Sequence, residues 1–477
     1  MAKQPMLKFV SIGRDMPEKR TAEARRQDFH EIYAEFADAK AKEQAGRCSQ
    51  CGVPYCQTHC PLHNNIPDWL RLTAEGRLKE AYELSQLTNT FPEICGRICP
   101  QDRLCEGNCV IEQAGHGTVT IGAVEKYITD TAWEEGWVEP ISPTSERVES
   151  VGIIGSGPGG LAAADVLRRA GVQVTIYDRA DRAGGLMTYG IPSFKLEKDV
   201  VMRRIEQLEQ GGAEFVLNCD VGTDISFDEI RNKHNAVLIA TGVYKSRDLD
   251  GPGAVAQGIV RAIDYLTASN RVSFGDSVPE FDSGELNAEG KQVVVVGGGD
   301  TAMDCVRTAV RQGAKSVICL YRRDRDNMPG SQREVANAEE EGVVFEWLSA
   351  PVGFAGDPVN AVRVQKMRLG APDATGRQSP EPIEGAVEDA PADLVIKALG
   401  FEPEDLPTLW NQKELEVTRW GTVKAEFTTG RTALDGVYAV GDIVRGASLV
   451  VWAIRDGRDA AAAILDDLRP AQAIAAE

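Results

Sequence analysis

Three features of the sequence predict an α/β fold with two Rossmann-like units behind an α-helical N-terminal domain. Two apolar strands run into glycine-rich turns, at residues 155–160 and 297–302, and a helical pattern follows each turn. The third feature is a block that holds eight of the eleven cysteines, between residues 48 and 109. A chain of 477 residues is long enough for two to four domains.

The composition excludes several classes of protein. The net charge of −20 argues against a nucleic-acid-binding surface. No apolar run approaches the roughly 20 residues that a membrane-spanning helix needs, and residues 1–5 do not begin an apolar secretory signal. We therefore expect a cytoplasmic protein, in which structural disulfides are rare, so the cysteines need another explanation.

The first glycine-rich turn has the spacing Gly155-x-Gly157-x-x-Gly160. In a dinucleotide-binding turn the first glycine allows the tight bend and the second lets a pyrophosphate approach the main chain. The third glycine lets the helix pack closely on the strand. The free N–H groups at the start of that helix then face the phosphates. Asp178 ends the next strand at the distance expected for an acid that holds a ribose hydroxyl.

The second turn, Gly297-x-Gly299-x-x-Ala302, has another accepted dinucleotide-binding spacing. Its next strand, residues 316–321, ends in Arg322 and Arg323 instead of an acid. Guanidinium groups suit a 2′-phosphate, so this unit should prefer NADP(H). The alternative is that the two arginines only solvate the end of a strand.

The last strand pattern of the chain, residues 436–442, closes in Gly441-Asp442. An acid at this place, facing the start of a helix, can bind the ribityl chain of a flavin. A glycine pair at residues 184–185, beyond the first acid, indicates further close contact between the backbone and an extended cofactor.

The cysteine block contains two groups, Cys48-x2-Cys51-x4-Cys56-x3-Cys60 and Cys95-x3-Cys99 with Cys105-x3-Cys109. Thiolates at these spacings can converge on a metal centre. Because the chain also carries redox-nucleotide motifs, an iron–sulfur centre is favoured, although the spacing departs from that of ferredoxins. Structural zinc held by four cysteines remains the alternative. Residues 20–45, 68–86 and 121–137 have helical patterns, and the first of these is interpreted as a solvated amphipathic helix without chemistry.

Together the two turns and the closing Gly-Asp resemble the two-dinucleotide-binding flavoproteins, a group that includes adrenodoxin reductase and thioredoxin reductase. With the cysteine block in front, nearly the whole chain resembles the small (beta) subunits of bacterial NADPH-dependent glutamate synthases. The same module is similar to the N-terminal half of dihydropyrimidine dehydrogenase. The resemblance implies FAD at the first turn, NADPH at the second and two 4Fe-4S clusters in the N-terminal domain.

The expected domains are a helical iron–sulfur domain over residues 1–145, an FAD-binding domain over 146–247 and 405–477, and an NADPH-binding domain over 248–404. The residues expected to bind FAD are Gly155, Ser156, Gly157, Gly159, Gly160, Asp178, Gly185, Leu186, Lys195, Gly441 and Asp442. The residues expected to bind NADPH are Gly297, Gly299, Asp300, Thr301, Ala302, Arg322 and Arg323.

The resemblance also implies the ligands of the clusters. One cluster would be held by Cys48, Cys51, Cys56 and Cys109, and three corners of the other by Cys60, Cys99 and Cys105. The fourth ligand in the related dehydrogenase is a glutamine from the following helix. Here that position is Glu125, so the fourth ligand stays open and Cys95 is the rival candidate.

No acid–base side chain is expected to be catalytic, because the cofactors carry the chemistry. The resemblance implies that electrons leave through the clusters to a large (alpha) subunit with glutaminase and FMN sites, which makes L-glutamate from L-glutamine and 2-oxoglutarate. Since this chain begins Met1-Ala2-Lys3 and offers no N-terminal cysteine nucleophile, it should not make glutamate alone. The alternatives are a subunit of an NADPH–ferredoxin transhydrogenase, a reductase for another acceptor, and a zinc-stapled scaffold without catalysis.

Overall fold

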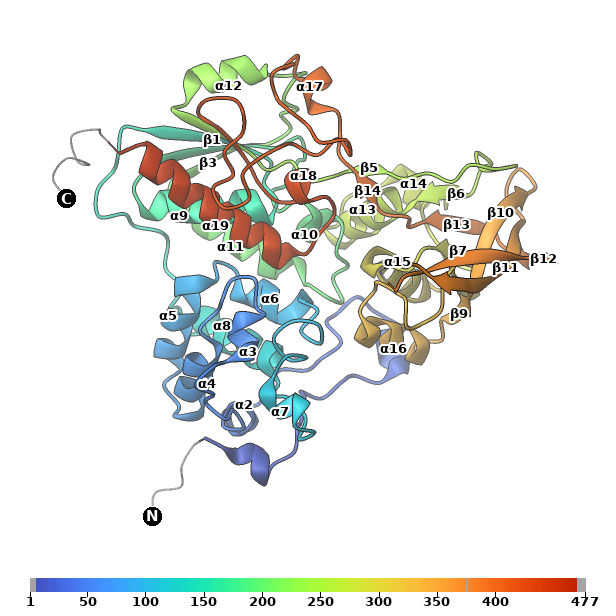
Figure 1. The fold of residues 1–477 in the computed structure, drawn as a ribbon, viewed down its shortest axis with the longest axis horizontal. Coiled ribbons are helices and arrows are strands. Elements are labelled where there is room, and N and C mark those ends of the chain that lie inside the picture. Colours follow the sequence, from blue (N-terminus) through green and yellow to red (C-terminus); the bar gives the residue numbers. More distant parts are fainter. Residues whose placement is uncertain (1–5, 375, 470–477) are drawn as a thin grey trace.

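The computed structural model describes residues 6–374 and 376–469, and it shows an α/β fold with two parallel sheets behind a helical N-terminal part (Figure 1). The predicted fold class is therefore confirmed. The first residues of the expected helical domain, 1–5, and the last residues of the expected FAD-binding domain, 470–477, lie outside the described residues.

The first sheet has five parallel strands in the order β15-β4-β1-β2-β3. The last strand of the chain thus joins a sheet that begins nearly three hundred residues earlier. The strands are β1 (Ser150–Ile154), β2 (Gln173–Tyr177), β3 (Ala213–Val216), β4 (Ala236–Ile239) and β15 (Val437–Ala439). The helices around it are α9 (Pro158–Arg169), α10 (Leu186–Tyr189), α11 (Lys198–Gln210), α12 (Phe227–Lys233), α17 (Leu406–Leu409), α18 (Asp442–Arg445) and α19 (Val450–Asp467). We call this part the flavin-side unit, after the cofactor that the sequence predicts there.

The second sheet repeats the same parallel design in the order β6-β13-β7-β8-β9. Its strands are β6 (Ile259–Arg261), β7 (Gln292–Val296), β8 (Ser316–Tyr321), β9 (Val344–Trp347) and β13 (Leu394–Lys397). Its helices are α13 (Ala262–Ser273), α14 (Pro279–Asp282), α15 (Asp300–Arg311) and α16 (Gln332–Glu340). We call this part the nicotinamide-side unit, again after the predicted cofactor.

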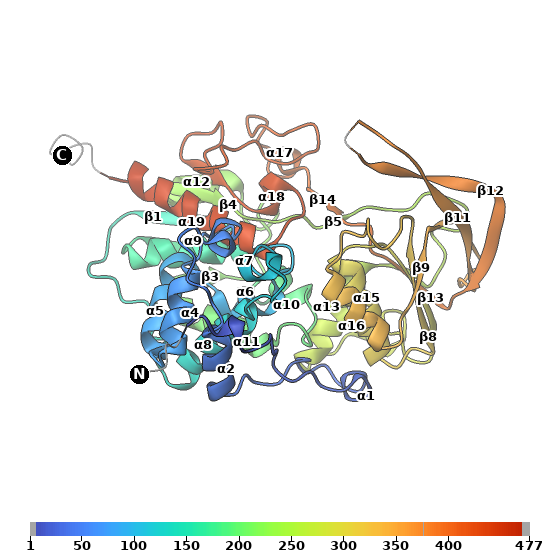
Figure 2. The same cartoon turned by 60° about the horizontal axis from the view of Figure 1, so that its bottom comes forward.

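An antiparallel three-stranded sheet projects from the nicotinamide-side unit (Figure 2), formed by β10 (Ser349–Ala355), β11 (Ala361–Pro372) and β12 (Gln378–Pro391). Where the chain crosses between the two units, a two-stranded ladder forms from β5 (Lys245–Ser246) and β14 (Phe401–Glu402).

The N-terminal part packs its helices around buried Trp69, Ile121 and Val124. The elements are η1 (Lys8–Val10), α1 (Ala22–Arg25), α2 (Asp38–Ala45), α3 (Tyr55–Thr58), α4 (Ile66–Ala74), α5 (Leu78–Thr88), α6 (Pro92–Ile98), α7 (Val110–Gln113) and α8 (Ile121–Glu134). The pattern at residues 68–86 forms two helices, because the chain turns at Gly76 with φ +81°, a conformation that favours glycine.

The helix predicted over residues 20–45 is wrong for most of its length. Only α1 and α2 are helical there, and residues 18–34 instead fold back on themselves. Arg20 N donates to Ile32 O at 2.9 Å, and Ala34 N donates to Glu18 O at 2.9 Å. We call residues 18–34 the N-terminal hairpin. Its tip contains α1, which lies against α16 of the nicotinamide-side unit and far from α2 (Figure 2).

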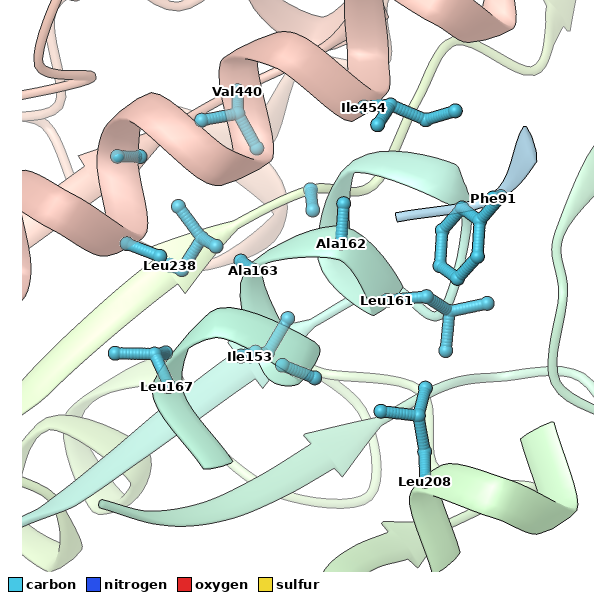
Figure 3. Close-up of a cluster of buried hydrophobic side chains, with 14 of the residues drawn as sticks. Phe91, Ile153, Leu161, Ala162, Ala163, Leu167, Leu208, Leu238, Val440 and Ile454 are labelled. Atoms are coloured by element: carbon cyan, nitrogen blue, oxygen red, sulfur yellow. The ribbon is translucent and has the colours of Figure 1, made fainter. Parts of the chain in front are cut away.

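The helical part and the flavin-side unit share one hydrophobic core. Phe91 and Ile94 of the helical part belong to the same buried cluster as Ile153, Leu161 and Ile454 of the flavin-side unit. Figure 3 shows Phe91 beside Leu161 of α9. Residues 95 and 99 also belong to this cluster, so the core places part of the cysteine block against the first nucleotide motif.

Among the helices of residues 6–374 and 376–469, we find none whose length and apolar character would let it cross a membrane.

His234 makes the stability of the flavin-side unit sensitive to acid. Its ring lies behind β1, where Nε2 is 3.0 Å from the hydroxyl of Tyr177 and Nδ1 is 3.1 Å from that of Ser150. Burial and the neighbouring Lys233 lower the pKa of His234 to about 4. An unfolded chain binds a proton there below about pH 6.5, so stability is lost as the pH falls from about 6.5 to 4.

We expect His234→Gln to reduce this part of the pH dependence. Urea unfolding at pH 7 and pH 5 should show a smaller loss of unfolding free energy in the variant than in the wild type. An equal loss in both proteins would contradict the role of His234.

Candidate functional site

The first glycine-rich turn has the backbone geometry that a bound pyrophosphate needs. Gly155 has φ +105°, and a Cβ there would lie 2.4 Å from the carbonyl oxygen of Ala240. A Cβ on Gly160 would lie 2.1 Å from the carbonyl oxygen of Gly155, which explains how closely α9 packs. A Cβ on Gly157 would meet nothing within 4 Å, so this face of the turn is open to a ligand.

Asp178 and Ser156 are joined at the ends of β2 and β1. Asp178 Oδ2 accepts from the backbone N–H of Ser156 at 2.7 Å and also from the Ser156 hydroxyl. Asp178 Oδ1 accepts from Ala180 N at 2.9 Å. The acid is therefore fixed beside the glycine turn, where the sequence predicts that it binds a ribose.

The remaining predicted FAD residues lie around the same turn. Gly185 has φ +55°, and a Cβ there would lie 3.0 Å from Cα of Gly157. Gly159 faces another way, because its Cβ would lie 3.3 Å from Ala453 O, so its small size serves the packing of α9 on α19. Burial raises the pKa of Asp442, which follows Gly441, to about 6.

One cavity of about 560 Å³ connects these groups. Gly155, Gly157, Asp178, Gly185, Leu186, Lys195, Gly441 and Asp442 line it, together with Asp300 and Thr301 of the nicotinamide-side unit and residues 97–100 of the helical part. Thr241 and Ser331 also line it, and each has a buried hydroxyl without a hydrogen-bond partner in the described part of the chain. Such orphaned hydroxyls fit a cavity that receives a polar ligand.

The second glycine turn repeats the geometry of the first. Gly297 has φ +148°, and its Cβ would lie 2.2 Å from Ala398 O. A Cβ on Gly299 would meet nothing within 4 Å, and Ala302 is fully buried under the turn. Asp300 Oδ1 accepts from Ser331 N at 2.9 Å. This turn therefore offers a second open backbone face.

Arg322 and Arg323 lie at the end of β8 and are not part of the cavity lining. Arg322 is exposed. Arg323 donates through Nη2 to Asn327 Oδ1, so its guanidinium is partly engaged within its own loop. The pair stands beside the strand that carries Gly297, as an adenosine 2′-phosphate site requires.

The predicted ligands of the first cluster lie together in the helical part. Cys48, Cys56 and Cys109 are buried and Cys51 is partly exposed. Burial, with the charges of Cys109 and Cys51, raises the pKa of Cys48 to about 11. Burial, with Cys48, Cys109 and Cys51, raises that of Cys56 to about 12. Without a metal the thiols of Cys48 and Cys56 are neutral, and a bound metal centre would remove their protons.

The predicted ligands of the second cluster lie beside the first group, because Cys105 is close to Cys60 and also to Cys56. Burial, with the charges of Glu125 and Cys95, raises the pKa of Cys60 to about 12. The thiol of Cys105 is fully buried near Cys60 and Glu125, and its pKa is raised well above normal, mainly by burial. Cys99 lines the cavity beside the first glycine turn, so this group is next to the flavin-side site.

Both candidates for the fourth position lie in this second group. Glu125 Oε1 accepts from Asn64 at 2.8 Å and Asn89 at 3.1 Å, and burial raises its pKa to about 8. Cys95 Sγ lies 3.8 Å from Asn89 Oδ1. Within residues 6–374 and 376–469, no three His, Cys, Asp or Glu side chains are gathered closely enough to hold a single metal ion.

One cavity residue, Arg333 of α16, carries no sequence signal of its own. It donates to Cys99 O at 3.4 Å and to Gln101, and outside the cavity lining Arg103 donates to Pro329 O at 2.8 Å. These contacts join the helical part to the nicotinamide-side unit. Thr241 was within reach of sequence reasoning, because it lies in a strand-end pattern that repeats at residues 398–400.

Two protein-family models match parts of this chain. The family described as pyridine nucleotide-disulphide oxidoreductase matches residues 149–457, and domain II of dihydropyrimidine dehydrogenase, with its 4Fe-4S cluster, matches residues 25–137. The fold and the paired glycine turns thus define an oxidoreductase of the pyridine nucleotide-disulphide class with an iron–sulfur domain in front.

More specifically, the chain belongs to the family of glutamate synthase [NADPH] small chains. It is 66% identical to that chain of Azospirillum brasilense over 465 residues, covering 97% of this chain and 96% of the relative. It is 46% identical to that of Escherichia coli over 471 residues, covering 97% and 99%. The predicted family, and with it the prediction of an oxidoreductase, are confirmed.

Among solved structures, FprA from Mycobacterium tuberculosis has a similar fold. The TM-score is 0.58 at 22% identity, and the match covers 69% of this chain and 86% of FprA. This likeness supports the arrangement of the two parallel sheets.

Proposed function

We propose that this chain is the electron-input subunit of a glutamate synthase. In this proposal NADPH binds at the second glycine turn, FAD binds at the first, and two 4Fe-4S clusters in the helical part carry electrons to a large (alpha) subunit. The large subunit, with glutaminase and FMN sites, makes L-glutamate from L-glutamine and 2-oxoglutarate. The proposed domains are those expected from the sequence, and the proposed location is the cytoplasm.

The observation that carries the proposal is the shared cavity. Residues from both glycine turns and from the cysteine domain line one space of about 560 Å³. A hydride donor, a flavin and a one-electron acceptor must lie close together in such an enzyme, and this cavity is the place where the three parts meet. The family membership supports the same assignment.

In this proposal the chain's own residues bind the cofactors and orient them. The open faces at Gly157 and Gly299 receive pyrophosphates, and Asp178 holds a ribose. The thiols of the two cysteine groups supply the sulfur ligands that iron–sulfur centres need. Bound FAD and NADPH supply the redox chemistry, and the protein supplies position and electrostatics.

Cofactor and product analysis test the proposal. The chain is co-expressed with the large subunit from the same source and purified anaerobically, and FAD, iron, sulfide and zinc are counted. We expect one FAD and two 4Fe-4S clusters in the chain, and glutamate formation that needs NADPH, glutamine, 2-oxoglutarate and both subunits. Zinc without iron would favour the scaffold alternative. Reduction of ferredoxin without glutamate formation would favour the transhydrogenase.

The coenzyme preference depends on Arg322 and Arg323. Changing both residues to glutamate should lower kcat/KM for NADPH by roughly 100-fold or more, because two charge-assisted contacts to the 2′-phosphate are lost. The value for NADH should change little. Arg325→Glu is the matched control, because Arg325 is an exposed arginine on the same loop that pairs with Glu339 at 2.8 Å. An unchanged preference for NADPH in the double variant would contradict the assignment.

A further inference from the structure

The N-terminal hairpin connects all three parts of the molecule. At its tip, the buried side chain of Arg25 donates to Glu341 Oε1 at 3.0 Å and to Glu340 Oε2 at 2.6 Å. Lys19 Nζ also donates to Glu340, at 2.6 and 2.7 Å. Nearer its base, Glu31 pairs with Lys126 at 2.6 Å and with Arg97 of the helical part.

The tip contacts a buried cluster of arginine and glutamate side chains in the nicotinamide-side unit. Glu341 is fully buried and also accepts from Arg307 at 2.8 and 3.0 Å and from Arg311 at 2.6 and 3.1 Å. Because two arginines remain on Glu341 without Arg25, the cluster can stay paired when the hairpin contact is removed. The Arg25 contact therefore serves the junction more than the unit itself.

The flavin-side unit reaches the same cluster. Phe194, fully buried, lies under the guanidinium groups of Arg307 and Arg311, at 4.5 and 3.9 Å from its ring centroid. Its other neighbour is Phe29 of the hairpin, with 6.3 Å between ring centroids. Beside it, Lys195 pairs with Asp304 of α15 at 2.8 Å, and both residues line the shared cavity.

The two units are connected covalently only where the chain passes from one to the other. The chain crosses between them at the two-residue strands β5 and β14. Units joined through short segments rotate relative to each other unless a large interface prevents it. The hairpin adds ion pairs and an aromatic contact between the units from outside both of them.

We infer that the N-terminal hairpin is a positioning element for hydride transfer, with Arg25 as its central positioning residue. It holds the nicotinamide-side unit at a fixed orientation against the flavin-side unit and the cysteine domain. This inference rests on the proposed function, because it assumes that a hydride passes between the two glycine turns. Bound NADPH would supply the hydride from its C4 atom, and bound FAD would accept it together with both electrons.

The test compares Arg25→Leu with Arg26→Leu in the full chain with its cofactors. Arg26 is the exposed neighbour and its replacement removes the same charge. Stopped-flow measurement of flavin reduction by NADPH should show a limiting rate roughly 10- to 100-fold lower in Arg25→Leu, because misplacement by about 1 Å has effects of that size. The apparent dissociation constant for NADPH should change by less than roughly two-fold, because its binding residues are untouched.

A readout independent of turnover is hydrogen exchange of α16. In the protein without nucleotide, Arg25→Leu should speed exchange in residues 332–340, and Arg26→Leu should not. If Arg25→Leu does not fold, both measurements are made on Lys19→Leu instead. This variant removes the partly exposed contact with Glu340 and leaves the buried cluster intact.

The outcomes separate the two claims. Failure of NADPH to reduce the flavin of the wild type would overturn the proposed function. If the wild type is reduced and Arg25→Leu has an unchanged limiting rate with faster α16 exchange, the hairpin only stabilises the structure and the inference is wrong. A slower limiting rate in Arg25→Leu alone supports it.

Discussion

Replacing Gly155 by alanine is expected to abolish retention of FAD. The residue has φ +105°, and a Cβ would lie 2.4 Å from the carbonyl oxygen of Ala240 on the neighbouring strand end. The substitution therefore adds backbone strain of about 1–3 kcal/mol to a clash with main chain that cannot move aside easily. Flavin content per purified chain, read from the absorbance spectrum, should fall close to zero, and the midpoint of thermal unfolding should fall with it.

Gly157→Ala is the matched comparison, two residues away. A Cβ there meets no protein atom within 4 Å, so the apo fold should keep its stability. The methyl group would instead enter the space assigned to the pyrophosphate, and FAD affinity should fall without a change in apo stability. If Gly157→Ala binds FAD normally, the open face of the turn is not the phosphate site.

Gly155 and Gly160 also show why the nucleotide motifs could be predicted from the sequence. Their requirement is partly local, because the positive φ of Gly155 and the contact of Gly160 with the Gly155 carbonyl oxygen both arise within the turn. The acid that follows, Asp178, is fixed by the same βαβ geometry, and the structure finds it bonded to Ser156. Local rules of this kind are present in any single sequence.

The N-terminal hairpin could not be predicted from local sequence patterns of this kind. A run rich in alanine, glutamate and arginine is typical of an exposed helix, and nothing local indicates that Arg25 will be buried. Its partner Glu341 lies 316 residues later in the chain, so the ion pair follows from how the units assemble. Arg333 at the cavity is a similar case, because its acceptors are Cys99 O and Gln101 of another part.

The same limit applies to Arg323. The sequence predicts that it follows a strand, and the structure places it just beyond the end of β8, next to the proposed 2′-phosphate site. It does not indicate that Asn327, four residues later, would accept from the guanidinium. Arg322 is the exposed member of the pair and is therefore the better candidate for the contact with the coenzyme.

The second large effect is expected from Arg204→Met, which breaks the buried ion pair between the flavin-side unit and the cysteine domain. Arg204 Nε and Nη2 donate to the two oxygens of Glu93 at 2.8 and 2.9 Å, and both side chains are almost fully buried. Leaving Glu93 as an unpaired buried charge should cost about 3–5 kcal/mol of unfolding free energy. Methionine keeps the length of the side chain, so the loss reports mainly on the charge.

Denaturant unfolding measures this effect, and two further variants define its cause. Lys424→Met removes an exposed pair with Glu416 and should cost no more than about 1 kcal/mol. Glu93→Leu combined with Arg204→Met removes both charges and should recover much of the loss, because no unpaired ion remains buried. A loss in Arg204→Met as small as that in Lys424→Met would show that the pair is not a stabilising link.

The location of this pair connects stability to electron transfer. Glu93 lies on α6, which ends one residue before Cys99, and Arg204 lies on α11 of the flavin-side unit. Because Cys99 lines the cavity next to the first glycine turn, we expect the pair to help set the separation between the proposed flavin and the proposed cluster that Cys99 would bind. In Arg204→Met, reduction of the flavin by NADPH should therefore persist below the unfolding midpoint, while the subsequent reduction of the clusters becomes slower.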